Sequence, residues 1–280
     1  MQHRRRLAVA ATALVLLAPG CSDGAKKDGA VGRVRERIGS AIRDALEEAR
    51  KRNEQQAGDV ERDRPGEQTE TQIRTDGNVE FDYAAYQQLL ETVLQSLEAY
   101  WARALPAELG TEFTRPAGGY KYYRGEEGGP ACGNEQAPPN NAFYCPAGDF
   151  IAWDESGLMI PYYVSAGDFA AAYVLAHEYG HAIQARLGGE VPPRGVLLEL
   201  QADCFAGSWA RSVADDGRLS PGDLDESVVA LYRARDVPGT PWTDPRAHGS
   251  AFDRTRAFIR GYDGGPADCA RISREDFDLR

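Results

Sequence analysis

The sequence is short of long apolar runs and of positive charge. Its one N-terminal apolar run, Leu7 to Leu17, is too short to cross a bilayer. The net charge of -11 argues against nucleic acid as a partner, since phosphate binding requires clustered Lys and Arg. No internal repeat is visible, and 280 residues are enough for one substantial core. The simplest organisation is one folded domain with appendages.

The N-terminus has the pattern of an export signal. Met1 to Arg6 is basic and precedes the apolar run, which predicts a signal peptide over residues 1–20. The run ends in Leu17-Ala18-Pro19-Gly20-Cys21, which resembles a bacterial lipobox with Ala18 in place of the usual Leu. We therefore expect an extracytoplasmic protein, lipid-anchored to the bacterial cell membrane through Cys21. The alternative is a secreted protein that is cleaved near Gly20.

No C-x-x-C pair occurs among the other four cysteines, which disfavours a metal site made of cysteines. An even number of cysteines in an exported chain predicts two disulfides. Cys132 and Cys145 bracket a loop rich in Pro and Asn, so a local bridge is expected there. Cys204 is then left to pair with Cys269, which would pin the C-terminal region to the rest of the domain.

Residues 21–75 lack aromatic side chains and are dominated by charged and polar ones. This composition predicts a tether that is flexible or partly helical. Apolar residues between Val31 and Ala49 recur at helical spacing, so a helix on a membrane or on a partner remains an alternative. The thin apolar stripe and the nearby acidic residues favour a solvated spacer.

Residues 76–280 are predicted to form the folded domain, in which apolar periodicity indicates mainly helices. The expected helices are Asp82 to Leu105, Asp168 to Leu187 with Asp168 as cap and Gly188-Gly189 as stop, Val196 to Ser212, Leu224 to Arg235, and Ser250 to Tyr262. Tyr120 to Tyr123 and Phe150 to Trp153 are expected strands. The fold class is therefore α+β, with a small sheet.

His177-Glu178-Tyr179-Gly180-His181 places two imidazoles on one face of the second expected helix. Two neutral imidazoles can hold one zinc ion, and Glu178 can reach a water molecule on the same metal. With only four histidines in the chain, a chance match to this pattern is improbable. Gly180 inside a helix indicates close approach of a neighbouring backbone.

A catalytic zinc ion usually takes three protein ligands, so one is still missing. Glu199 lies eighteen residues after His181, which leaves room for a turn and a returning helix. Asp203 is one turn further on the same face, from which it can accept a hydrogen bond from a ligating imidazole. We expect His177, His181 and Glu199 to bind the metal, with Asp203 behind them.

Three segments carry a family resemblance. They are His177-Glu178-Tyr179-Gly180-His181-Ala182-Ile183-Gln184, Glu199-Leu200-Gln201-Ala202-Asp203-Cys204-Phe205-Ala206-Gly207 and His248-Gly249-Ser250. Together they resemble the gluzincin-like neutral zinc metallopeptidase family of bacterial envelope proteins. The similarity runs from about Cys132 to Tyr262, with Asp253 where the family pattern leads one to expect Gln. The resemblance implies a zincin-like domain with one zinc ion.

The chemistry expected of this set is peptide hydrolysis. Zinc would lower the pKa of its bound water from about 15.7 to near 7, and Glu178 would take the proton. His248, Tyr179 and Arg254 are candidate donors to the carbonyl oxygen. For His248 an equal alternative is a cap, or a histidine with satisfied hydrogen bonds, at the start of a helix, and Tyr179 and Arg254 fit packing and an ion pair better.

The leading hypothesis is an envelope zinc endopeptidase that acts on a peptide or protein. One alternative is a non-catalytic lipoprotein with a structural zinc ion and a further ligand such as Asp203. Another is a zinc amidase that acts on cell-wall peptides.

Overall fold

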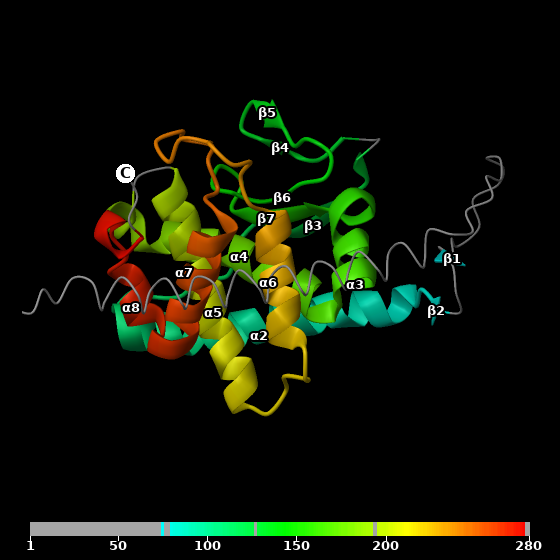
Figure 1. The fold of residues 1–280 in the computed structure, drawn as a ribbon, viewed down its shortest axis with the longest axis horizontal. Helices are drawn as coiled ribbons and strands as arrows, with labels where there is room; N and C mark the ends of the chain where they lie inside the picture. Colours follow the sequence, from blue (N-terminus) through cyan, green and yellow to red (C-terminus); the bar gives the residue numbers. More distant parts are fainter. Residues whose placement is uncertain (1–73, 76–78, 126–127, 193–194, 278–280) are drawn as a thin grey trace, which may run out of the picture. The chain divides into compact units, whose positions relative to one another are not determined.

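The computed structural model describes residues 74–75, 79–125, 128–192 and 195–277 (Figure 1). The predicted signal peptide, Cys21 and all but the last two residues of the predicted tether lie outside these ranges, and so does the apolar pattern from Val31 to Ala49. Those predictions rest on the sequence. Among the described residues, no helix combines the length and apolar character that a membrane span requires.

The described part of the chain is mostly helical with few strands, which confirms the α+β class. The α-helices are α2 (Tyr83–Leu109), α3 (Ile160–Ala166), α4 (Asp168–Leu187), α5 (Val196–Asp215), α6 (Asp223–Arg233), α7 (Ala251–Gly264) and α8 (Pro266–Ala270). Further short helices are the π-helix η3 (Glu155–Met159) and the 3-10 helices η4 (Gly188–Glu190) and η5 (Arg274–Asp276). The strands are β1 (Arg74–Thr75), β2 (Val79–Glu80), β3 (Gly119–Tyr123), β4 (Ala131–Cys132), β5 (Glu135–Gln136), β6 (Ala142–Cys145) and β7 (Phe150–Asp154).

The largest sheet has the order β3-β7-β6. Its central strand, β7, is buried over its whole length and pairs with β3 in parallel and with β6 in antiparallel. Both predicted strands are therefore present and are neighbours. β6 forms one edge of this sheet and contacts α4 through Tyr144, whose backbone N–H reaches Glu178. This edge becomes one wall of the site described below.

Helix α4 lies at the centre of the helical core and is buried on all sides over most of its length. Its neighbours are α2, α3, α5 and α6 (Figure 1). Aromatic pairs join these layers: Phe169 on α4 stacks on Trp209 of α5 at 5.6 Å, and Trp101 on α2 meets Phe205 edge-on at 5.3 Å. A central, buried helix gives the side chains it carries little freedom to move.

At Gly180 the backbones of α4 and α5 approach each other closely. A Cβ atom there would lie 2.8 Å from the carbonyl oxygen of Ala202 and 2.9 Å from its Cα, which is too close for any larger residue. The close approach expected from the sequence is therefore present, and the neighbour is α5. Gly207 and Gly261 play the same part between α5 and α7. Helix α5 is thus held tightly between the helices on either side of it.

Both predicted disulfides are confirmed. Cys132–Cys145 joins β4 to β6, and Cys204–Cys269 joins α5 to α8. The alternative of a second metal site built from four cysteines is wrong, because all four sulfur atoms are in these bridges. One bridge holds a strand at the edge of the sheet, and the other lies in the helical core.

Several predicted boundaries need correction. Helix α2 continues through Pro106 to Leu109 and ends only at Gly110, whose φ of 65° suits glycine. Asp168 does not cap α4, because Gly167 takes the cap position and the Phe169 N–H is bound instead by Glu226 of α6. Helix α5 runs on to Asp215, α6 ends at Arg233, and α7 extends from Ala251 to Gly264.

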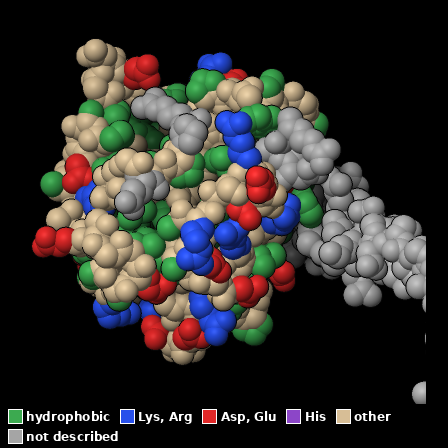
Figure 2. Space-filling model, turned by 90° about the vertical axis from the view of Figure 1, so that its left-hand side faces the viewer, with side chains coloured by type: hydrophobic (Ala, Val, Ile, Leu, Met, Phe, Trp, Pro, Cys, Tyr) green, Lys and Arg blue, Asp and Glu red, His purple; other side chains and the backbone are tan. Residues whose placement is uncertain are grey.

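On the face seen in Figure 2, acidic and basic side chains of the described residues are interspersed with apolar ones. This face shows no extended area of one charge sign.

Candidate metal centre

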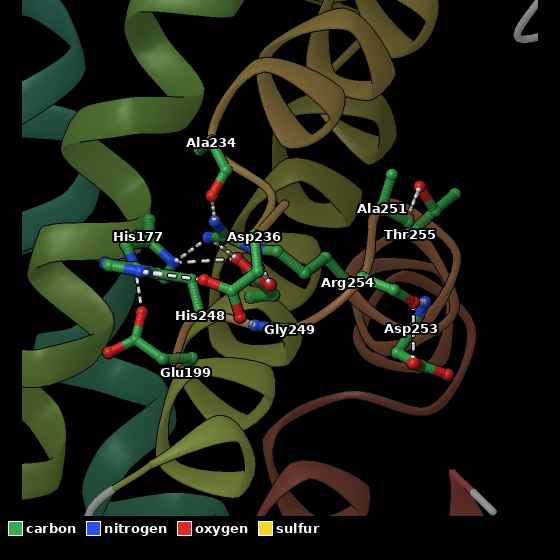
Figure 3. Close-up of polar contacts among 12 residues, drawn as sticks. His177, Glu199, Ala234, Asp236, His248, Gly249, Ala251, Asp253, Arg254 and Thr255 are labelled. Atoms are coloured by element: carbon green, nitrogen blue, oxygen red, sulfur yellow. Dashed lines mark hydrogen bonds and ion pairs between the residues drawn. The ribbon is translucent and has the colours of Figure 1, made fainter. Parts of the chain in front are cut away.

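His177, His181 and Glu199 come together between α4 and α5. Each offers one ligand atom, and these atoms all lie within 4.8 Å of one another. The Glu199 carboxylate places Oε2 3.2 Å from His177 Nε2 and Oε1 3.5 Å from His181 Nε2. Figure 3 shows the Glu199 carboxylate turned toward the His177 ring. The helical spacing of the histidines and the returning helix therefore bring the three side chains together.

The residues fit a zinc ion. Two imidazole nitrogens and one carboxylate oxygen are a donor set that zinc accepts. Glu199 Oε2 is buried and has no hydrogen bond of acceptable geometry. A buried carboxylate oxygen normally has a partner, and a cation held between these three groups would provide one.

The remaining imidazole nitrogens are both occupied. His177 Nδ1 lies 2.7 Å from Asp203 Oδ1, and His181 Nδ1 lies 2.7 Å from Gln184 Oε1. Because an ionised carboxylate can only accept, His177 Nδ1 must be the donor, which leaves the Nε2 lone pair for a metal. The same assignment holds for His181, since the Gln184 amide nitrogen is turned away toward the carbonyl of Leu198.

Asp203 is itself held on every side. It is fully buried and accepts hydrogen bonds from Tyr173 and from Arg254 of α7. The Arg254 contact is bidentate, with Nε 2.8 Å from Oδ2 and Nη2 2.9 Å from Oδ1. Arg254 therefore forms the ion pair that its position suggested. Asp203 supports His177 and has no oxygen left for a metal.

A second chain of hydrogen bonds supports the other histidine. Gln184 donates to Gln201 Oε1 at 3.1 Å, and Gln201 donates to the carbonyl oxygen of Cys269 at 3.2 Å. Cys269 belongs to α8 and to the core disulfide. The orientation of His181 thus depends on α4, α5 and α8 together.

The charges around the histidines favour a cation. Burial acts to lower the pKa of His177, but the Asp203 carboxylate and its hydrogen bond, with Glu199, raise the pKa to about 10. For His181 burial acts in the same direction, and Glu199 raises the pKa. Burial would raise the pKa of Glu199, yet His181 and His177 hold that pKa well below its usual range. The site therefore attracts positive charge, which a metal ion can supply in place of protons.

Glu178 stands beside the ligands without joining them. It is 7% exposed, and its Oε2 accepts a 3.0 Å hydrogen bond from the backbone N–H of Tyr144 on β6. Glu178 and the three ligands line a cleft of about 880 Å³. Its other walls come from β6, from η3 and α3, from the end of α6 and from the loop before α7. A carboxylate next to a metal and open to a cleft is where a general base is needed.

His248 lies at the rim of this cleft, with its side chain 55% exposed. Its Nδ1 is 3.7 Å from Asp236 Oδ1, while Asp236 Oδ2 accepts the Gly249 N–H at 2.7 Å (Figure 3). The N-cap of α7 is Ser250, which accepts the Asp253 N–H. The capping role considered for His248 therefore belongs to Ser250.

Sequence reasoning did not assign roles to Tyr144, Tyr173, Gln184 and Asp236. For two of them the spacing held a signal: Tyr173 is one helical turn before His177, and Gln184 is one turn after His181. Tyr144 and Asp236 act through contacts distant in sequence, for which no local signal exists. Tyr179 is fully buried and packs near Tyr120 of β3, outside the cleft lining, which agrees with a structural role.

Comparisons with known proteins agree with this geometry. A family model described as "Putative neutral zinc metallopeptidase" matches residues 55–272. The uncharacterized protein YpfJ of Escherichia coli (strain K12) is 38% identical over 150 residues, covering 45% of this chain and 52% of YpfJ. The chain thus spans about half the length of that relative. The uncharacterized protein Rv2575 of Mycobacterium tuberculosis (strain ATCC 25618 / H37Rv) is 33% identical over 213 residues, covering 65% of this chain and 69% of Rv2575. No solved structure matches the chain significantly.

Proposed function

Because the chain belongs to the putative neutral zinc metallopeptidase family, we propose that it is a zinc-dependent endopeptidase of the bacterial cell envelope. His177, His181 and Glu199 hold the zinc ion, and Glu178 is the general base. The observation that carries this proposal is the position of Glu178, beside the three ligands and facing a cleft large enough for a peptide. The predicted signal peptide and Cys21 support the envelope location.

A zinc ion in this site would supply Lewis acidity and would lower the pKa of water to near neutrality. The protein supplies the proton transfers. Glu178 accepts the proton of the attacking water and then delivers it to the leaving amine, while the Tyr144 N–H fixes the position of its carboxylate. We assign to His248, which has Asp236 beside its Nδ1, the role of donor to the carbonyl oxygen as this gains charge.

The edge strand β6 supports a peptide as substrate. The backbone carbonyl of Asn141, just before the strand, accepts a hydrogen bond from the backbone N–H of Asp154 at the end of β7. Along a strand, the backbone N–H and C=O groups of successive residues point to opposite sides. The backbone groups of Ala142 therefore face away from β7, on the side where Tyr144 contacts Glu178. Residues 141–144 all line the cleft. An extended peptide can add to such an edge through backbone hydrogen bonds.

The alternative of a structural zinc ion needs a fourth protein ligand. Asp203 was the candidate, but its oxygens are already bound by His177, Tyr173 and Arg254. Within the described residues, the group that can hold a metal here consists of His177, His181 and Glu199 alone. Three ligands and an open cleft favour a catalytic ion, since catalytic zinc keeps one position for water or substrate.

The proposal is tested by comparing the wild-type protein with Glu178→Gln. Both are loaded with zinc and incubated with a peptide library, with and without a chelator, and products are identified by mass spectrometry. We expect metal-dependent cleavage by the wild type and a loss of about 10²- to 10⁴-fold in Glu178→Gln, with equal zinc content. Glu112→Gln, an exposed glutamate outside the cleft lining, is the matched control.

Unchanged cleavage by Glu178→Gln would contradict the mechanism. Cleavage confined to amide bonds of cell-wall peptides would assign the same residues to an amidase. A zinc-loaded wild type that cleaves neither the peptide library nor cell-wall peptides would favour the non-catalytic alternative.

A further inference from the structure

Two arginines line the catalytic cleft, and no carboxylate of the described residues forms an ion pair with either of them. Arg233 is the last residue of α6, Arg235 follows two residues later, and both belong to the cleft wall. Among the described residues, neither forms an ion pair. Arg233 donates to Ser165 Oγ at 2.7 Å, and Arg235 donates to the carbonyl oxygen of Tyr232 at 2.6 Å.

Aromatic rings also hold both guanidinium groups. Arg233 lies 5.3 Å from the centre of the Tyr162 ring, and Arg235 lies 3.6 Å from that of Tyr232. These contacts leave several N–H groups of each arginine free for a ligand, since a guanidinium has five. A positive charge in the last turn of α6 also favours the helix end, which accounts for Arg233 but not for Arg235, beyond the helix.

The two arginines are close to the metal centre through Ala234, the residue between them. Arg254 donates to the Ala234 carbonyl at 2.8 Å, and its Nη2 lies 3.4 Å from His177 Nδ1. Figure 3 shows Ala234, Arg254 and His177 grouped in this way. One guanidinium group therefore links the backbone between Arg233 and Arg235 to a metal ligand.

The carboxylates that the structure describes around the cleft are already engaged. Glu178 accepts the Tyr144 N–H, Glu199 faces the two histidines, and Asp236 turns to Gly249 and His248. In a chain of net charge -11, two arginines that no described carboxylate pairs with, beside the catalytic residues, call for a ligand of negative charge. A guanidinium can bind a carboxylate through two parallel hydrogen bonds.

We propose that Arg233 and Arg235 form an anion-binding subsite that selects peptides carrying a carboxylate near the bond to be cleaved. This inference rests on the proposed peptidase function and adds its substrate class. The carboxylate belongs either to an Asp or Glu side chain or to the free C-terminus of the peptide. The two sources share one chemistry and are separated by the experiment.

The test uses pairs of peptides built around a bond that the wild-type protein cleaves. In each pair, one position near the bond carries Glu or its neutral equivalent Gln, and each peptide is made with a free or an amidated C-terminus. We expect kcat/KM to be about tenfold higher for the best acidic peptide than for its neutral twin, because charged hydrogen bonds contribute more than neutral ones. The difference should shrink at high salt.

Charge reversal gives the sharpest variant. Arg233→Gln and Arg235→Gln should each reduce the preference, and Arg235→Glu should transfer it to a peptide with Lys at the same position. Arg103→Glu changes the net charge equally, at an exposed position of α2 outside the cleft lining, and should leave the preference unchanged. The free and amidated peptides show which carboxylate is bound.

Binding measured without cleavage separates this inference from the proposed function. The acidic and neutral peptides are labelled with a fluorophore, and zinc-loaded Glu178→Gln and the wild type are each titrated with them. A preference in binding that Arg235→Glu reverses supports the subsite even if no peptide is cleaved, in which case the proposed function alone fails. Equal affinities and equal kcat/KM for acidic and neutral peptides, or a preference that Arg235→Glu leaves intact, would overturn the subsite.

Discussion

The N-terminal end of α4 and its middle each gather three side chains that could hold a metal ion. Near the start of the helix these are Asp168, Asp223 and Glu226, and further along they are the two histidines with Glu199. In both groups the ligand atoms lie within 4.8 Å of one another. The distance between ligand atoms therefore does not distinguish them.

The surrounding hydrogen bonds do distinguish them. At the start of α4, Glu226 accepts the Phe169 N–H at 2.8 Å and so caps this helix, while Asp223 accepts the N–H of Ser220, in the turn before α6, at 2.7 Å. Burial, and then the charge of Asp168, raise the pKa of Glu226 to about 7. Around the histidines, in contrast, hydrogen bonds hold the far side of each ring and leave the near side free. The hydrogen bonds that orient the ligand side chains therefore distinguish a metal site from a cluster of carboxylates.

The largest difference between the histidine–Glu199 group and the acidic cluster is expected in zinc binding. His181→Ala removes a ligand and should lower zinc affinity by more than the roughly hundredfold ascribed to outer partners. Asp168→Ala, in the acidic cluster, should still bind one zinc ion per chain. Zinc content after dialysis against a competing chelator measures both. Loss of zinc in Asp168→Ala would show that the acidic cluster also binds the metal.

A second pair of variants compares Asp203, the carboxylate behind the histidine ligands, with Asp223, a member of the acidic cluster. Asp203→Asn should weaken zinc binding by roughly 10- to 100-fold and should destabilise the fold, because it leaves Arg254 buried without its counter-charge. Asp223→Asn keeps an acceptor for Ser220 and should not change zinc affinity. Competition with a fluorescent zinc indicator gives both affinities. Equal affinities would remove Asp203 from the metal site.

The contact between α4 and α5 gives the next smaller effect. Gly180→Ala places a methyl group against Ala202 and should lower the free energy of unfolding by about 1–3 kcal/mol. Gly189→Ala is the control, because no heavy atom lies within 4 Å of its added Cβ. Urea unfolding of the zinc-free proteins measures the difference. If both variants were equally stable, the two helices would have room to separate.

The smallest effect is a pH dependence at the acidic cluster. Glu226 favours its protonated form in the folded state, so its stabilising contribution is present below about pH 4.5 and is lost as pH rises through about 7. Glu226→Gln stays neutral and should lose less stability than the wild type between pH 5 and 8. Solvent screening limits the difference to on the order of 1 kcal/mol. Thermal unfolding across this pH range measures the stability of each protein, with Glu112→Gln as control. Parallel curves of stability against pH for Glu226→Gln and the wild type would contradict this prediction.

Short-range patterns in the sequence predicted much of the metal centre. Helical spacing placed His177 and His181 on one face, and Glu199 followed from the room needed for a returning helix. Gly180 indicated a close neighbour because glycine is costly within a helix. The two disulfides followed from the number of cysteines and the loop between Cys132 and Cys145. These features depend on the spacing of residues, on composition or on the even number of cysteines, all of which are visible in the sequence.

The rest depends on which segments meet. Nothing near Tyr144 shows that its N–H will hold Glu178, because their contact depends on how β6 lies against α4. Nothing near Glu226 shows that it will cap α4 in place of Asp168. The parallel pairing of β3 with β7 is equally invisible, since β-propensity does not specify a partner. Such contacts are set by tertiary packing, which a single sequence does not display.

The hydrogen bonds from His181 through Gln184 and Gln201 to Cys269 have a consequence for biosynthesis. A ribosome releases the histidines and Glu199 long before it reaches α8. The growing chain therefore exposes its zinc ligands before it can orient them. Only after α8 has been made and Cys269 has bonded to Cys204 does the last of these supports exist. The full set of supports for the zinc ligands therefore exists only once α8 has folded and this disulfide has formed.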